Sequence, residues 1–189
     1  MTFTPGLIGA VASSSGGVAL PAEAWVALES NTVSGSSTYT ITFNSGWASY
    51  KDLVLVSYAR GGGAASVMKM HFNNDTASNY GYQWLYGSPA AANGVDNDYI
   101  DFQWYGTSGY GNNFSCSVTY ISDVNSTTNH KQTLTTVADN LASAGYTAFE
   151  TNVWKSASAI TEIDLTDYSG GTIAAGSRVD LYGLSTVVA

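Results

Sequence analysis

The residues best suited to acid–base chemistry are Glu162 and Asp164, two carboxylates separated by one residue. Alternation along a predicted strand places both on one face, and Asp167 follows in the next turn. Two carboxylates that face each other across a groove can hydrolyse glycosidic bonds. A pair on a single strand face is more typical of side chains that meet water, and we expect that role here.

Two clusters of Asp and Asn offer the hard oxygen ligands that calcium prefers: 96–98 with Asp101, and 73–75 with Asn79. The first cluster lacks the Gly and terminal Glu of a twelve-residue calcium loop. Asp and Asn also shape turns by bonding to their own backbone. We interpret both clusters as turns, so the sequence predicts no metal and no cofactor.

The histidines and the single cysteine lie outside recognisable catalytic motifs. His71 lies on a predicted strand and His130 opens another, with no nucleophile elbow or zinc-binding helix around either. Cys116 is the only cysteine, which excludes an intrachain disulfide and a zinc site built on several thiolates. Its alternation with Phe114 and Val118 predicts a buried structural thiol. We therefore predict no catalytic residue.

Aromatic side chains are concentrated between residues 80 and 110. Tyr82, Trp84 and Tyr105 are candidates for contact with a glycan or another protein, because Tyr and Trp bury a large area at low entropic cost. Tyr80, Tyr82 and Trp84 share one parity and therefore one face of a strand. That face can pack inward or against another chain.

Composition excludes several classes of protein. Of the 189 residues, 44% are hydrophobic and 13% aromatic, which is enough to fold a core. Only 11% are charged, against about 25% in ordinary soluble domains. The net charge of −8 and the scattered cations argue against nucleic-acid binding, and no apolar run is long enough to span a membrane.

Period-two alternation predicts ten strands and an all-β fold, an antiparallel β-sandwich that is jelly-roll-like. We expect one domain over 19–189, preceded by an extended, uncleaved N-terminal arm over 1–18, and one short helix near 138–144. The predicted strands are 39–43, 52–58, 67–72, 82–86, 99–105, 114–121, 130–137, 148–154, 159–165 and 178–184.

Three segments carry a resemblance to a known family. The segment 71–82, His-Phe-Asn-Asn-Asp-Thr-Ala-Ser-Asn-Tyr-Gly-Tyr, resembles a motif of the type R-F-N-G-D-T-G-S-N-Y-x-Y. Trp154 with 159–163 resembles its W-x-n-A-I-T-x-I strand pair, and 176–184 resembles its G-S-x-x-x-L-Y-G-I ending. The family consists of virion structural β-sandwich domains, of decoration or fibre type, from tailed bacteriophages and cyanophages. The resemblance covers about residues 38–184.

The resemblance implies a non-enzymatic virion structural protein, made in the host cytoplasm and carried on the particle surface. Our first expectation is a capsid decoration (cement) protein, a homotrimer that binds the major capsid protein or other virion proteins. Phe3, Leu7 and Ile8 of the arm are the expected contact residues. Asn73, Asp75, Asn79 and Tyr80 are expected to form a structural turn.

Two alternatives stay open. A tail-fibre or receptor-binding domain would recognise host glycans through Tyr82, Trp84 and Tyr105. An enzyme would degrade polysaccharide with Glu162 and a distant carboxylate, although no catalytic motif supports that activity.

Overall fold

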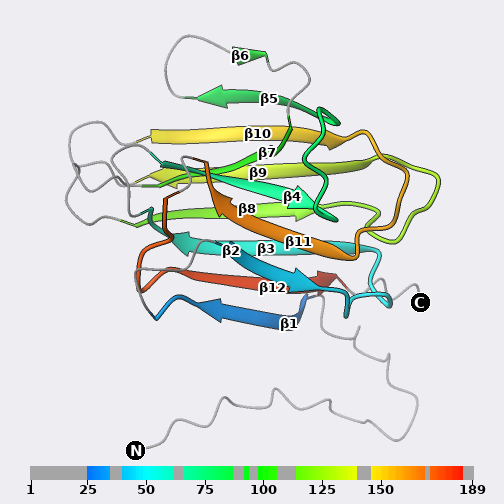
Figure 1. Cartoon of the computed structure of the whole chain (residues 1–189), viewed down its shortest axis with the longest axis horizontal. Helices are drawn as coiled ribbons and strands as arrows, with labels where there is room; N and C mark the ends of the chain where they lie inside the picture. The colour runs from blue at the N-terminus through cyan, green and yellow to red at the C-terminus, as the bar shows by residue number, and fades with distance from the viewer. Residues whose placement is uncertain are drawn as a thin grey trace, which may run out of the picture.

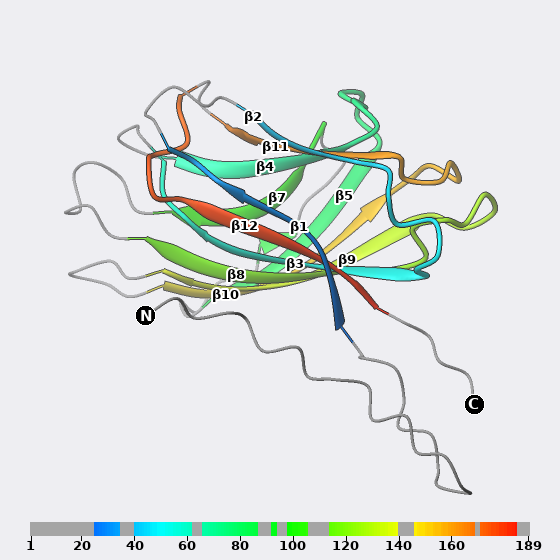
Figure 2. The same cartoon turned by 90° about the horizontal axis from the view of Figure 1, so that it is seen from below.

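The computed structural model describes residues 25–34, 40–61, 66–86, 92–93, 98–105, 114–139, 146–168 and 171–184. Within these ranges the chain forms twelve strands and no helix. Figure 1 looks through the smaller of two sheets onto the larger, and Figure 2 shows the two layers edge-on. The prediction of an all-β, antiparallel sandwich is confirmed. In these ranges no helix is long and apolar enough to cross a membrane.

All strand pairings are antiparallel. The large sheet contains, in spatial order, β1 (Trp25–Thr32), β12 (Arg178–Leu184), β3 (Asp52–Ala59), β8 (Ser115–Ile121), β9 (Lys131–Asp139), β10 (Tyr146–Trp154), β5 (Tyr80–Tyr86) and β6 (Ala92–Asn93). The small sheet contains β2 (Thr40–Asn44), β11 (Glu162–Asp167), β4 (Ser66–Phe72) and β7 (Ile100–Tyr105).

Connections between consecutive strands mostly pass from one sheet to the other. Strands β8, β9 and β10 differ, because they follow one another along the chain and are also neighbours in the large sheet. We call these three strands the meander. The jelly-roll-like part of the expected fold stays a prediction, and the predicted arm, residues 1–18, lies outside the described residues.

The ten predicted strands all occur, with ends shifted by a few residues. Strand β1 was not predicted because its register shifts between Ala27 and Glu29, and this irregularity interrupts the alternation that identifies a strand. Strand β6 has two residues, too few for a pattern. The helix predicted near 138–144 is wrong at its start, because Ala138 and Asp139 end β9, and 140–144 lie outside the described residues.

The apolar core lies between the sheets. Strands β2, β4 and β11 contribute alternate apolar side chains from the small sheet, and β3 and β12 contribute theirs from the large sheet. Trp47, Tyr80 and Trp154 are the bulkiest members, and all three are almost fully buried. The Trp47 indole N–H donates to the carbonyl of Ile160 at 3.0 Å, so its polar atom is satisfied within the core.

A glycine in β12 lets a tyrosine ring pack directly against the backbone. Gly183 is buried, and a Cβ added to it would lie 2.5 Å from atoms of the Tyr50 ring. Such a distance is far inside van der Waals contact, so only glycine fits while Tyr50 keeps its place against the core.

Gly183→Ala is therefore expected to lower the free energy of unfolding by about 1–3 kcal/mol through overpacking. Urea unfolding followed by tryptophan fluorescence measures this change. Gly46→Ala is the matched control, because a Cβ there meets only one backbone oxygen, at 4.0 Å. Equal stability of the two variants would contradict this account of the Tyr50 packing.

Candidate functional site

The meander has a polar inner face. Side chains that point from β8, β9 and β10 toward the sandwich interior are mostly hydroxyls, an amide and ionisable groups, and they are buried: Ser115, Ser117, Thr119, Lys131, Thr133, Thr135, Glu150 and Asn152. Strand β7 lies against this side of β8, β9 and β10. The meander therefore contributes only a few apolar side chains to the core, chiefly Ile121 and Trp154.

Some of these buried groups bond to one another across strands. The hydroxyls of Ser57 and Ser117 share a hydrogen bond of 2.7 Å, and those of Thr119 and Thr135 share one of 2.8 Å. The Lys131 ammonium donates to the carbonyl of Asn129 at 2.7 Å, and burial lowers the pKa of Lys131. Such pairing offsets the cost of removing polar groups from water.

The opposite face of the same strands exposes apolar side chains among uncharged polar ones. We define the outer face as the outward side chains of β3, β8, β9, β10 and β5. One row of neighbours runs straight across it: Val56, Val118, Thr136, Phe149 and Leu85. The next row is Val54, Tyr120, Leu134, Thr151 and Gln83.

Large apolar side chains on the outer face are substantially exposed. Val118 and Leu134 are each 40% exposed, Phe149 is 42% exposed, and Tyr58 and Leu85 more than half. A groove of about 700 Å³ lies on the outer face between β8, β9, β10 and β5, lined by Tyr120, Leu134 and Val153 among others. Apolar side chains that adjoin across five strands form a patch, and patches of this kind mark interaction surfaces.

The outer face carries almost no charge. Asp52, at the start of β3, is its only charged member within the described strands, and it accepts a hydrogen bond of 2.6 Å from the Tyr120 hydroxyl. Burial, that hydrogen bond and the nearby carboxylates raise the pKa of Tyr120 to about 12, so it stays neutral. Charge is found at its margins: Arg178 and Asp180 form an ion pair of 2.9 Å on neighbouring β12, and Lys51 and Asp123 form one of 3.4 Å beside Asp52.

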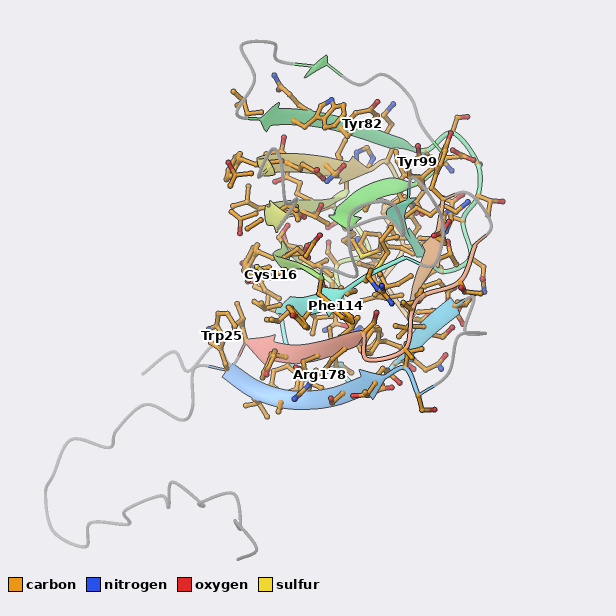
Figure 3. The ribbon with its side chains drawn as sticks, turned by 90° about the vertical axis from the view of Figure 1, so that its left-hand side faces the viewer. Trp25, Tyr82, Tyr99, Phe114, Cys116 and Arg178 are labelled. Carbon is orange, nitrogen blue, oxygen red and sulfur yellow. The ribbon has the colours of Figure 1, made fainter. Side chains whose placement is uncertain are left out.

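The meander thus reverses the usual arrangement, in which an antiparallel sheet turns its apolar side chains inward and its polar side chains to water. This reversal corrects the prediction for Cys116, whose thiol is exposed. Its alternation with Val118 holds, but both residues point outward. Figure 3 shows Cys116 and Trp25 on the side of the large sheet that faces away from the small sheet.

The predicted turn at 73–80 connects β4 of the small sheet to β5 of the large sheet. Asn73 and Asn74 have φ of 54° and 56°, left-handed values that Asn tolerates better than most residues. The Asn73 side chain accepts from the backbone N–H groups of Thr161 (2.7 Å) and Glu162 (3.1 Å), and it donates to the carbonyl of Ala159 (2.8 Å). The turn therefore also holds the start of β11.

Asp75 joins this turn to the end of β10. Its carboxylate accepts from the Ala77 backbone N–H and the Asn79 amide, each at 3.0 Å, and from the Trp154 indole N–H at 2.7 Å. The Tyr80 hydroxyl donates to the Asp75 carbonyl and accepts from the Phe72 N–H, both at 3.1 Å. Asp75, Asn79 and Tyr80 thus bond to one another within the turn, whereas Asn73 bonds to the start of β11.

The carboxylate pair lies in a polar groove of about 740 Å³ on the outer side of the small sheet. Glu162 lies beside Asp164, and its interaction with the Asp164 carboxyl raises the pKa of Glu162. Thr42 donates to Asp164, and the Asn74 amide donates to Glu162. The carboxyls are thus in contact on one strand rather than opposed across a groove, unlike the separated pairs of glycosidases.

His71 lines the same groove, and burial, followed by the charge of Lys69, lowers its pKa. The Lys69 ammonium lies 5.8 Å from the Tyr99 ring centre and 5.9 Å from that of Tyr168. Across the described ranges, no group of three or more His, Cys, Asp or Glu side chains is arranged to hold a metal ion. The polar groups of this groove mostly bond to one another.

The remaining predicted residues fall into two groups. Tyr82 and Trp84 contact each other edge to face and lie opposite Asn152 and Glu150, on the side of β5 that faces the sandwich interior. The side chain of Tyr105 is not among those described, and Phe3, Leu7 and Ile8 lie outside the described residues. The side chains of Tyr82 and Trp84 therefore point away from the outer face.

Searches of protein-family models, curated proteins and solved structures found no match to this chain.

The outer-face residues Val118, Leu134, Phe149 and Leu85 were not singled out from the sequence. Their signal was present, because each alternates with Ser, Thr, Glu or Trp along its strand. Alternation shows which residues share a face, but it does not say which face turns inward.

Asp75→Asn is expected to lower the free energy of unfolding by about 1–3 kcal/mol, because the new amide group must face N–H donors in either orientation. Urea unfolding at pH 7 measures the change. Ser78→Ala, at an exposed position of the same turn, is the control and should leave stability unaltered. An Asp75→Asn protein as stable as the control would contradict the proposed role of the carboxylate.

The same carboxylate predicts a pH dependence. Burial raises the pKa of Asp75, but hydrogen bonds from Trp154, Asn79 and Ala77 outweigh it and hold the pKa below its ordinary value of 3.8. A lowered folded-state pKa stabilises the fold above that value, and the stabilisation is lost as pH falls through the folded-state pKa. The stability difference between wild type and Asp75→Asn should therefore shrink in acid, as measured by urea unfolding from pH 7 to pH 2.5. A difference independent of pH would contradict it.

Proposed function

We propose that this chain is a non-enzymatic structural protein of a bacteriophage particle, a decoration protein that binds the outside of the head shell. It acts as a homotrimer whose copies contact one another through the outer face and the N-terminal segment. The trimer binds the major capsid protein, and the area it buries across neighbouring shell subunits opposes their separation.

The observation that carries this proposal is the reversed polarity of the meander. A strand set that buries Thr135 and Glu150 while it exposes Leu134 and Phe149 is unfavourable for an isolated domain. Leu134 and Phe149 are 40% and 42% exposed, so covering the exposed part of either side chain contributes roughly 0.6–1.3 kcal/mol, and contact with another subunit supplies this contribution. In a protein that assembles with other subunits, such a face can be buried in a contact between them.

Composition and resemblance support the same role. The motif segments at 71–82, 154–163 and 176–184 resemble those of phage structural domains. A net charge of −8 with few cations disfavours contact with packaged DNA. The hydrogen-bonded turn built by Asn73 and Asp75 gives a rigid link between the sheets, which suits a subunit that bears load.

The test is reconstitution on capsids that lack this protein, taken from the phage that encodes it. Wild-type protein should add regular density at capsomer junctions in electron micrographs and should sediment as a trimer. Leu134→Lys and Phe149→Lys each place a charge on the outer face and should reduce particle binding at least about tenfold, equivalent to about 1.4 kcal/mol.

Thr40→Lys is the matched control, because it adds the same charge at an exposed position of the small sheet. It should bind particles as wild type does, and circular dichroism should show that all three variants fold. Shells that stay bare with wild-type protein would overturn the proposal. Equal loss of binding in the Thr40→Lys control would remove the outer face from it.

A further inference from the structure

We infer that the N-terminal segment of a neighbouring copy, residues 1–24, lies across the outer face. This inference rests on the proposed function in one respect, namely that copies of the chain assemble with one another. It assigns the occupant of a surface that the described fold leaves open.

The chemistry of the outer face favours an uncharged occupant. The central rows of the outer face, around Val118, Leu134 and Phe149, contain hydroxyl, amide and apolar side chains and no charge. A charged partner would lose its water there without gaining an ion pair, which is costly. The exposed thiol, hydroxyl and aliphatic groups of the outer face can instead pack against small and apolar residues of a partner.

The segment before β1 has that chemistry. Glu23 is the only charged side chain among residues 1–24, and the rest of the segment is dominated by Gly, Ala, Ser and apolar residues. Phe3, Leu7, Ile8 and Val11 give it apolar side chains at intervals along its length. The segment is therefore nearly uncharged, as the central rows of the outer face are.

The segment joins the large sheet at its edge strand, β1. Trp25, the first residue of β1, is 49% exposed, and its ring lies 5.7 Å from that of Tyr182. Figure 3 shows Trp25 on the same side of the large sheet as Cys116. An extended segment of 24 residues spans up to about 79 Å, whereas eight strands are about 34 Å across, so reach is ample.

Exchange of this segment between copies explains how a closed oligomer forms. Each copy donates one segment and accepts one on its outer face, so a ring of copies leaves no outer face uncovered. The apolar rows are then buried in every copy.

Cys116 provides a reporter for the test, because it is the only cysteine and lies exposed on the outer face. Full-length proteins carrying Phe3→Cys, Leu7→Cys, Ile8→Cys or Val11→Cys, one at a time, are oxidised with diamide and run on non-reducing gels. We expect covalent links between copies at one or more positions, formed at least about tenfold faster than in the control, because docking raises the local thiol concentration.

The control moves the target thiol to the small sheet. Each segment cysteine is combined with Cys116→Ser and Thr40→Cys, which leaves an exposed thiol away from the outer face. Peptide mass spectrometry of the linked species identifies the two joined cysteines. Wild-type protein, in which Cys116 is the only cysteine, is oxidised in parallel.

The outcomes separate the inference from the proposed function. Links between copies from the segment to Cys116 support the inference, whether or not the protein decorates capsids. Links within one chain, rapid Cys116–Cys116 links in wild type, or rates equal to the control would each overturn it. Capsids that stay bare while the links form would reject the decoration role and leave the inference standing.

Discussion

The two-residue period of a β-strand is the constraint on which this structure depends. In β8, β9 and β10, turning either set of alternate side chains inward turns the other set outward, so no local change can bury both. The chain buries Ser117, Thr135 and Glu150 in these strands and exposes Val118, Leu134 and Phe149. The interior gains hydrogen bonds such as that between Thr119 and Thr135, and the exterior presents apolar side chains to solvent.

The apolar core lies mainly elsewhere, which is how the fold can accommodate this reversal. Strands β2, β11 and β4 of the small sheet pack against β3 and β12 of the large sheet, with Phe43, Leu55 and Leu165 among the buried residues. The turn that holds Asp75 against Trp154 ties this core to the end of the meander. The apolar core and the exposed apolar side chains thereby lie in different parts of one sandwich.

The two sides of the sandwich also differ in chemistry. The outer side of the small sheet holds the carboxylates Glu162 and Asp164, a histidine and a lysine in one polar groove. The outer face of the large sheet has almost no charge and exposes apolar groups that have no such partners in the described fold. This asymmetry directs the search for a partner to the large sheet.

The sequence by itself determined the all-β class, ten of the strands and the residues that share each face, because turn residues and period-two alternation are local properties. It also singled out the Asn73–Tyr80 segment, because Asn and Asp shape turns through their own backbone. Only the tertiary structure decided that Cys116 points outward, that Asn74 donates to Glu162, and that Asp75 reaches Trp154, 79 residues away. The reason is physical: which face of a strand turns inward depends on what the opposite sheet and β7 pack against it, and no single strand carries that information.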